Sequence, residues 1–229
     1  MGTHNYLRRR ATLATALVST VAAVLAIVTP PSASAATTTA RTLLFRLTVA
    51  SESGSSTYER TYFKHWIDTN GDCQDTRVEV LISESKVTPS YSSSRHCTVT
   101  RGKWYSYYDG KTWTAPGDVD IDHMVALKEA WESGARRWSS TNRTRYANDL
   151  GLSAALVAVT DNVNQSKSDR DPADWLPPRT AVHCTYAIQW VQVKYRWRLT
   201  INSAERSALS SILSGSCGSR TVTVPSRAL

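Results

Sequence analysis

The sequence has 229 residues, a length that excludes peptide toxins and fits one domain better than two. Hydrophobic residues make up 41% and charged residues 20% of the chain, a balance typical of globular proteins rather than of disordered ones. Lys and Arg outnumber Asp and Glu by 27 to 19, and the resulting net charge of +8 favours anionic partners.

The first 35 residues have the organisation of a secretory signal peptide. Arg8–Arg10 form a positive segment, residues 11–28 carry no charge, and Ala33–Ala35 is a small-x-small cleavage site. The uncharged run could also span a bilayer as a retained anchor, but the cleavage site favours removal. We therefore predict a secreted, extracellular protein with no membrane contact after processing. Loss of the three arginines lowers its net charge to +5.

Export permits disulfides, and the chain has four cysteines, none at a C-x-x-C spacing that would suggest a zinc knuckle. Four cysteines allow three pairings. We favour Cys73–Cys97 and Cys184–Cys217, because each bond closes one local unit. Each would stabilise the fold by about 3–4 kcal/mol if it acts by restricting the unfolded chain.

The first half of the predicted domain has few strongly periodic segments. We expect a short helix over residues 43–47, and residues 77–82 fit either a strand or the start of a helix. An aromatic-rich strand is predicted over residues 99–107, with a tight turn at Asp109-Gly110. Residues 118–123 alternate between polar and apolar side chains, which indicates another strand.

The second half is predicted to be mainly helical. Residues 127–138 have helical spacing, and an aromatic stripe over residues 186–197 indicates a helix whose stripe we assign to the core. Asn202 and Glu205 form a capping-box pattern that opens a helix through Leu213, with Gly215 placed to end it. We predict one domain over residues 36–219, followed by a flexible tail, residues 220–229.

The first of two polar clusters lies in residues 118–123. Strand alternation places Asp118, Asp120 and Asp122 on one face, and His123 on the opposite face with Ile121. Taken alone, this pattern also fits a hydrogen-bonded core histidine beside aspartates that keep an exposed edge from aggregating. For Asp122 and His123 to serve one site, the strand must end or twist there.

The second polar cluster follows an apolar run over residues 156–159. Asp161 is a candidate helix N-cap, and Asn164 and Lys167 then lie one turn apart on the same face. Together the two clusters contain what metal-assisted phosphodiester cleavage requires. A carboxylate and an amide oxygen suit a hard divalent cation, an imidazole can take a proton from water, and a lysine can hold a phosphate oxygen.

At this point the sequence resembles a known family, the secreted actinomycete members of the HNH endonuclease superfamily, which are similar to the nuclease domain of GmrSD-type restriction enzymes. The resemblance extends over roughly residues 44–217. It is carried by Asp120-Ile121-Asp122-His123-Met124-Val125-Ala126-Leu127, Glu129-Ala130-Trp131, Ser133-Gly134-Ala135, Arg145-Tyr146-Ala147-Asn148-Asp149, Asn164-Gln165-Ser166-Lys167 and Asp171-Pro172-Ala173-Asp174-Trp175-Leu176-Pro177-Pro178, with His65-Trp66-Ile67-Asp68 and Cys73-Gln74-Asp75-Thr76-Arg77-Val78-Glu79-Val80-Leu81 upstream.

The resemblance implies an α+β fold with a ββα-metal core of the HNH, or His-Me finger, type. In such a core two strands and a helix surround one divalent ion; here we expect added helices and two disulfides. The resemblance assigns metal binding to Asp122 and Asn164, the general base to His123, and the shaping of the connecting loop to Asn148. Ala126 stands where the family usually has proline, a departure that affects the loop after the base and no ligand.

We therefore expect a secreted, metal-dependent, HNH-type endonuclease that hydrolyses DNA with little sequence specificity, with RNA left open as a substrate. Mg²⁺ is the first choice of metal, and Mn²⁺ or another divalent ion are alternatives. Lys167 in the catalytic centre, with Arg77, Arg143 and Arg145 around it, is expected to contact backbone phosphates. We expect the protein to be a monomer.

Three alternatives stay open. One is a non-catalytic secreted module that binds polyanions through its positive charge. A second is a calcium-stabilised structural domain, since Asp68-x-Asn70-x-Asp72 and Glu79 have the spacing of a calcium loop. Against it, Cys73 replaces the turn glycine, and a strand-like run follows where a helix should. The third concerns the metal, which the aspartate face of residues 118–122 would hold without Asn164.

Overall fold

The computed structural model describes residues 1–2 and 35–229. The predicted signal peptide, residues 1–35, therefore lies almost wholly outside the described residues. Residues 35–229 form one compact unit. Within the described residues, no helix has both the length and the apolar character needed to cross a membrane.

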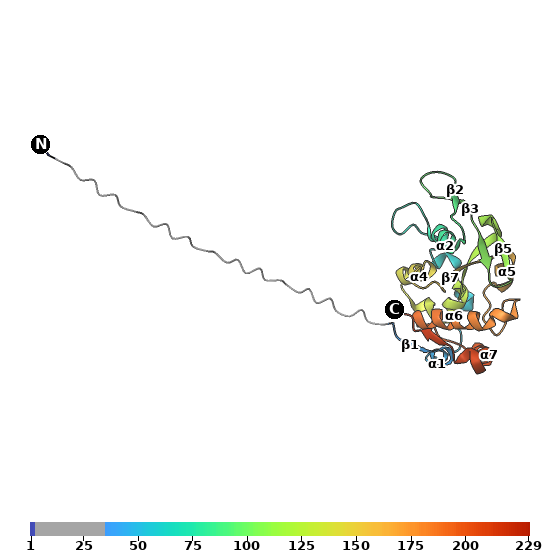
Figure 1. Cartoon of the computed structure of the whole chain (residues 1–229). Coiled ribbons are helices and arrows are strands. Elements are labelled where there is room, and N and C mark those ends of the chain that lie inside the picture. The colour runs from blue at the N-terminus through green and yellow to red at the C-terminus, as the bar shows by residue number, and fades with distance from the viewer. Residues whose placement is uncertain (3–34) are drawn as a thin grey trace. The chain divides into compact units, whose positions relative to one another are not determined.

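Short helices surround small sheets in this unit (Figure 1). The α-helices are α1 (Ala40–Phe45), α2 (Thr76–Glu84), α3 (Leu127–Glu132), α4 (Ser140–Ala147), α5 (Asp161–Lys167), α6 (His183–Arg196), α7 (Ser203–Ile212) and α8 (Gly215–Gly218). The 3-10 helices are η1 (Ser55–Thr57), η2 (Arg60–Tyr62), η3 (Pro116–Asp118), η4 (Ala135–Arg137) and η5 (Thr180–Val182). The strands are β1 (Thr37–Thr39), β2 (Ser90–Tyr91), β3 (Val99–Arg101), β4 (Trp104–Ser106), β5 (Lys111–Trp113), β6 (Val119–His123), β7 (Leu156–Thr160) and β8 (Thr221–Thr223). Among the described residues the strands form antiparallel pairs: β1–β8, β2–β3, β4–β5 and β6–β7.

The pair β6–β7, followed directly by α5, is the centre of the unit. Its register runs from Val119 opposite Thr160 to His123 opposite Leu156. Every residue of β7 is buried, which explains its unbroken apolar run. Helix α5 begins one residue earlier than predicted: Thr160 is the N-cap and Asp161 is the first helical residue. The mixed α/β architecture agrees with the predicted class, and α3, η4 and α4 lie between the two strands in the chain.

The segment over residues 77–82, for which a strand and a helix start were both open, is the helix α2. The Asp75 side chain accepts a hydrogen bond from the backbone N–H of Val78 and caps the helix. The helix packs Val80 and Leu81 into a small core with the β6–β7 pair, where the indole of Trp104 donates to the Leu81 carbonyl at 2.8 Å. Local capping thus decided an element that its short apolar run left ambiguous.

The strand predicted over residues 99–107 is interrupted, a correction to the sequence analysis. It divides into β3 and β4, which pair with different partners, β2 and β5. Gly102 lies at the division, where an added Cβ would come within 2.5 Å of the Trp104 ring. The glycine therefore permits a close approach between the backbone and this indole.

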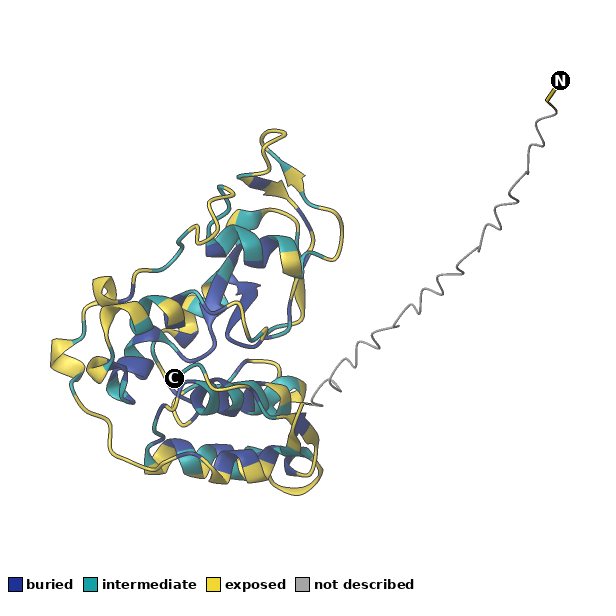
Figure 2. Ribbon diagram, turned by 90° about the vertical axis from the view of Figure 1, so that its left-hand side faces the viewer, coloured by how far each residue is buried: buried dark blue, intermediate teal, exposed yellow. Residues whose placement is uncertain are grey.

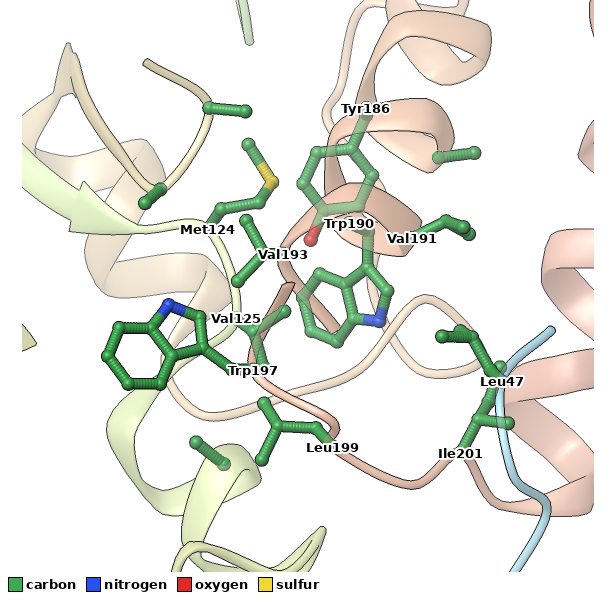
Figure 3. Packing of buried hydrophobic residues seen from close by; sticks show 14 of the residues in the cluster. Leu47, Met124, Val125, Tyr186, Trp190, Val191, Val193, Trp197, Leu199 and Ile201 are labelled. Carbon is green, nitrogen blue, oxygen red and sulfur yellow. The ribbon is translucent and has the colours of Figure 1, made fainter. Parts of the chain in front are cut away.

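Helices α6 and α7 both contribute side chains to the larger core, and Figure 3 shows Tyr186, Trp190 and Val193 of α6 near Met124 and Val125. The predicted aromatic stripe is confirmed as core, because Tyr186, Trp190 and Trp197 are each at most 1% exposed. The predicted capping box at Asn202 and Glu205 is also confirmed. Gly215, in contrast, begins α8 instead of ending α7, whose C-cap is Leu213. Figure 2 shows the buried residues gathered where helices and central strands meet.

Both predicted disulfides are confirmed. Cys73 bonds Cys97, and Cys184 bonds Cys217. The C-terminal residues differ from the flexible tail that we expected. Thr221–Thr223 form β8 against β1, and the backbone N–H of Ala228 donates to the Arg196 carbonyl at 3.0 Å. These backbone groups are satisfied by partners distant in the sequence, a pairing that local composition did not reveal.

Candidate active site

A cleft of about 470 Å³ opens where β6 ends beside α5. It brings together the predicted Asp122, His123 and Asn164. Its wall is formed by Tyr58, Arg60, Ile121, Asp122, His123, Ala126, Leu127, Lys128, Asn164, Gln165, Ser168 and Asp169. The strand ends at His123, so that Asp122 and His123 both reach the cleft although they point to opposite faces along the strand.

His123 is held in one orientation at the end of β6. Its Nε2 lies 2.9 Å from the carbonyl oxygen of Ala147, which can only accept a hydrogen bond, so Nε2 carries the proton and Nδ1 keeps the lone pair. The Trp66 ring stacks on the imidazole at a centroid distance of 5.4 Å. Burial lowers the pKa of His123 to about 3, and the positive charge of Arg60 acts in the same direction. The ring is therefore neutral at pH 7.

Asp122 lies beneath the cleft with both carboxylate oxygens engaged. The Lys167 ammonium donates to Oδ1 at 2.7 Å, and the Tyr108 hydroxyl donates to Oδ2 at 2.6 Å. Burial raises the pKa of Asp122, and the nearby Lys167 charge opposes this effect. A carboxylate offers about four lone-pair positions, so each oxygen can accept a metal bond in addition to its hydrogen bond.

Asn164 forms a hydrogen bond with Asp120. Its Nδ2 donates to Asp120 Oδ2 at 3.1 Å, and Asp120 is half-buried. The Asn164 amide oxygen remains an acceptor. Asp118 belongs to η3 and precedes the strand, so it does not extend a continuous aspartate face. The oxygens of Asp122, Asn164 and Asp120 are hard donors of the kind that Mg²⁺ and Mn²⁺ prefer, and the residues present fit such an ion.

Lys167 has contacts that differ from the expected phosphate contact. It is fully buried, and besides Asp122 its ammonium donates to the backbone carbonyl of His123 at 2.9 Å. A buried ammonium with two acceptors is directed at the protein and not at a substrate. In this arrangement Lys167 fixes the position of the Asp122–His123 pair.

The three predicted arginines brace the backbone. Arg77 donates to the carbonyls of Pro116 and Val119, at 2.9 and 3.1 Å. Arg143 donates to the carbonyls of Tyr62 and Trp138, and Arg145 to Asn142 Oδ1 and the Ala228 carbonyl. Among the described residues, the lining of the cleft includes none of the three arginines.

Asn148 connects the segment between β6 and β7 to a loop from earlier in the chain. Its Nδ2 donates to the carbonyls of Lys64 and Thr144, both at 2.8 Å, and its Oδ1 accepts from the backbone N–H of Ile67 at 3.2 Å. These contacts attach the segment over residues 64–67 to the C-terminal end of α4.

Comparison with known proteins identifies the family. Residues 75–212 match the family described as the C-terminal domain of GmrSD restriction endonucleases. The chain belongs to this family. It carries a nuclease-related domain, in agreement with the resemblance drawn from the sequence. An uncharacterized secreted protein of Arthroderma benhamiae is 44% identical over 194 residues, which covers 85% of this chain and 93% of the relative. No solved structure matches the chain.

Several residues of the site were missed by the sequence analysis. Tyr58, Arg60 and Lys128 line the cleft, and Trp66 and Tyr108 contact His123 and Asp122. Lys128 forms an ion pair with Asp169 at 2.7 Å. Tyr108 belongs to a tyrosine-rich run, and Trp66 belongs to the His65-Trp66-Ile67-Asp68 segment that carries the family resemblance. Both signals could have indicated residues of the site. Nothing in the local sequence distinguishes Arg60 from other surface arginines.

Carboxylates also gather away from the cleft. Glu52 comes close to two sets of acids, Glu129 with Glu132 and Asp171 with Glu205. Glu129 and Glu205 already share the ammonium of Lys194, which neutralises much of this charge. These sets therefore do not compete with the cleft as the candidate site.

The predicted calcium-loop spacing forms a self-capped turn. Asp68 accepts from the backbone N–H groups of Gly71 and Cys73, at 2.7 and 2.8 Å. A helix, α2, follows this turn, and not the strand-like run that we counted against a calcium loop. Burial raises the pKa of Glu79 in the first turn of α2, and the nearby aspartates add to the effect.

Proposed function

We propose that this chain is a secreted, divalent-metal-dependent endonuclease of the HNH type, with His123 as its general base. The observation that supports it most directly is the orientation of His123. Nε2 is bound to the Ala147 carbonyl, and the free lone pair on Nδ1 belongs to a ring that lines the cleft. A neutral imidazole held in this way has a free lone pair that can accept a proton from water.

The residues of the chain itself have two tasks in this mechanism, proton transfer and the positioning of the groups around it. Nδ1 of His123 takes a proton from a water molecule, and the hydroxide attacks the phosphorus in line with the leaving oxygen. The resemblance to the family implies products with a 5′-phosphate and a 3′-hydroxyl. Lys167 and Tyr108 hold the Asp122 carboxylate, and Asn148 and Trp66 hold the loop and the ring around the base.

Asp122 and Asn164 are the residues that would hold the metal, Mg²⁺ or Mn²⁺, in a core of the ββα-metal type. When bound, such a cation would supply Lewis-acid stabilisation of the charge that develops on the phosphate and on the leaving oxygen. Asp120 is the carboxylate next to Asn164, since its Oδ2 accepts a hydrogen bond from the Asn164 amide. The pairing of β6 with β7 and the start of α5 directly after β7 support this assignment, because Asp122 and Asn164 line the same cleft.

The substrate is a nucleic acid, with DNA preferred and RNA as an alternative. The net charge of +5 on the processed chain favours a polyanion, and family membership links the domain to restriction endonucleases. The cleft has no extended helix or ribbon that would read a base sequence, within the described residues, so we propose little sequence specificity. The protein acts as a monomer outside the cell.

Plasmid digestion with a chelator and with a panel of divalent metals tests the proposal. His123→Ala should lose nearly all hydrolysis while its thermal unfolding stays close to that of the wild type, and added metal should not restore the activity. Asp122→Ala and Asn164→Ala should recover part of their loss at high Mg²⁺ or Mn²⁺, because mass action refills a weakened site. Near-normal turnover by His123→Ala would refute the assignment of the base.

Metal titration separates the two ligand arrangements. If Asn164 is a ligand, Asn164→Ala should bind Mn²⁺ more weakly than the wild type. Unchanged affinity would instead favour the carboxylates Asp120 and Asp122 without Asn164. A protein that binds DNA but cleaves none of it with any metal would be the non-catalytic polyanion-binding module.

A further inference from the structure

A segment that precedes the matched family region forms one wall of the cleft. The family match begins at residue 75, whereas Tyr58 and Arg60 line the cleft together with Asp122 and His123. Trp66, from the same segment, stacks on the His123 ring. Tyr58, Arg60 and Trp66 therefore bring this earlier segment to the proposed base and its cleft.

The guanidinium of Arg60 differs from the other cations in and near the cleft. Lys128 is paired with Asp169, and Lys167 is buried against Asp122. Arg60 is exposed, and in the part of the chain that the structure describes no carboxylate lies within ion-pair distance of it. An exposed and uncompensated guanidinium facing a cleft is suited to a phosphate.

The backbone that carries Arg60 is anchored on its C-terminal side. The next residues place Phe63 in the core, where it is fully buried. Asn148 then bonds the backbone of Lys64 and Ile67. Between them Trp66 has a positive φ of 55°, a conformation that a bulky residue adopts only where its surroundings impose it. Arg60 is thus presented from a fixed segment.

We propose that Arg60 binds a non-bridging oxygen of the substrate phosphate in this cleft, so that residues outside the matched family region complete the active site. The inference rests on the proposed function in one respect, that the ligand is a nucleic acid. A planar guanidinium can donate two parallel hydrogen bonds to a phosphate, and an ammonium cannot reproduce this geometry. Arg60→Lys should therefore keep the charge but lose part of the affinity.

Binding and cleavage are measured separately. Fluorescence anisotropy of a short fluorescein-labelled DNA duplex, in a buffer with chelator, reports binding without hydrolysis. Arg60→Ala should weaken binding about tenfold, the effect of one charge-assisted hydrogen bond. It should also lower the slope of log affinity against log salt by about 0.9, the value for one phosphate contact. Arg60→Lys should keep the slope. Arg95→Ala, which removes an exposed arginine outside the cleft lining, is the matched control.

The outcomes distinguish the two proposals. If the wild type cleaves DNA with Mg²⁺ or Mn²⁺ but Arg60→Ala binds and cleaves like Arg95→Ala, the assignment of Arg60 is overturned and the nuclease proposal stands. If no metal gives cleavage and Arg60→Ala still loses affinity and salt slope, Arg60 binds phosphate in a protein that is not a nuclease. Arg60→Gln, with its unfolding temperature compared to the wild type, provides a second variant if the alanine variant folds poorly.

Discussion

Two buried lysines, Lys167 in α5 and Lys194 in α6, form ion pairs in different surroundings: one pair borders the cleft, and the other lies wholly in the interior. Both side chains are fully buried, and both ammonium groups contact carboxylates at 2.6–2.7 Å. Lys194 has two carboxylate partners, Glu129 and Glu205, and also contacts Ser133 and the Thr200 carbonyl. Lys167 has one carboxylate partner, Asp122, and one backbone carbonyl.

The Lys194 cluster joins separate helices in the interior. Its partners come from α3, from α7 and from the segment between α6 and α7. Burial alone would lower the pKa of the Lys194 ammonium, but the charges of Glu205 and Glu129 outweigh it, and the pKa is raised. All partners of this ammonium are internal, so the cluster acts as a crosslink.

The Lys167 cluster faces the cleft on one side. Asp122, its only carboxylate partner among the described residues, also lines the cleft beside His123. The lysine neutralises one aspartate and fixes the strand end, while the second lone pairs of that aspartate stay available. The comparison teaches that a buried ion pair is informative about function when one of its partners also borders a cavity.

The largest expected effect is that of Lys194→Met on stability. The substitution leaves Glu129 and Glu205 buried without their cation, which should lower the free energy of unfolding by about 3–5 kcal/mol. Urea denaturation followed by tryptophan fluorescence measures the loss. The hydrolytic activity per folded molecule should stay within about twofold of the wild type, because the Lys194 cluster does not contact His123, the proposed general base.

Lys167→Met should lose less stability and more activity. Asp122 keeps the Tyr108 hydrogen bond and can take up a proton, so we expect a loss of about 2–3 kcal/mol. A protonated Asp122 is a poor metal ligand, and the carbonyl of His123 loses its donor. Activity per folded molecule should therefore fall by at least about tenfold. A factor of ten corresponds to about 1.4 kcal/mol, the size of one lost contact to a charged group. If both methionine variants lose activity in proportion to their folded fraction, the contrast between the two lysines is wrong.

The smallest effect concerns Glu84, a largely buried carboxylate that no ammonium contacts directly within the described residues. Burial raises its pKa from 4.5 to about 7, although it accepts a hydrogen bond from the backbone N–H of Ala158. Folded Glu84 thus holds a proton that an unfolded chain releases near pH 4.5. Its contribution favours the folded state in acid and is lost as the pH rises through about 7.

Glu84→Gln should therefore raise the stability at pH 8 relative to the wild type by on the order of 2 kcal/mol, and leave it nearly unchanged at pH 4. The difference between the two unfolding curves, measured by urea denaturation at a series of pH values, isolates Glu84 from other groups. A pH-independent difference would show that Glu84 titrates normally. Glu84 thus shows the effect of burial on a carboxylate that has no lysine partner, in contrast to the carboxylates paired with Lys167 and Lys194.

Much of the fold was accessible from the sequence because its signals were local. The capping box at Asn202, the aromatic stripe of α6 and the alternation before His123 each depend on neighbours in the chain. Residues 77–82 did not decide between strand and helix, since a short apolar run fits both, and the Asp75 cap was the deciding feature. The pairing of β1 with β8 could not be predicted, because it joins the two ends of the unit.

The candidate site was predicted in part. The motif spacing indicated Asp122, His123 and Asn164, and these three side chains do line one cleft. The burial of Lys167 was not predicted, because the exposure of a helix face depends on which other elements pack against it, and the residue spacing within the helix does not show this. Arg60 was missed for a related reason: its approach to His123 joins residues separated by most of the first half of the domain.

The pairing of β1 with β8 has a consequence for rearranging the chain. Thr37 lies opposite Thr223, and the Val224 N–H donates to the Ala36 carbonyl at 2.8 Å, so the start of the unit lies beside a strand that ends six residues before Leu229. A short linker could join the two ends of the unit, and new ends could be opened in the exposed loop over residues 92–96, to give a circular permutant. Force applied between residues 36 and 224 would instead break the hydrogen bonds of the β1–β8 pair one after another. The same pair that protects the ends from fraying would thus offer little resistance to force.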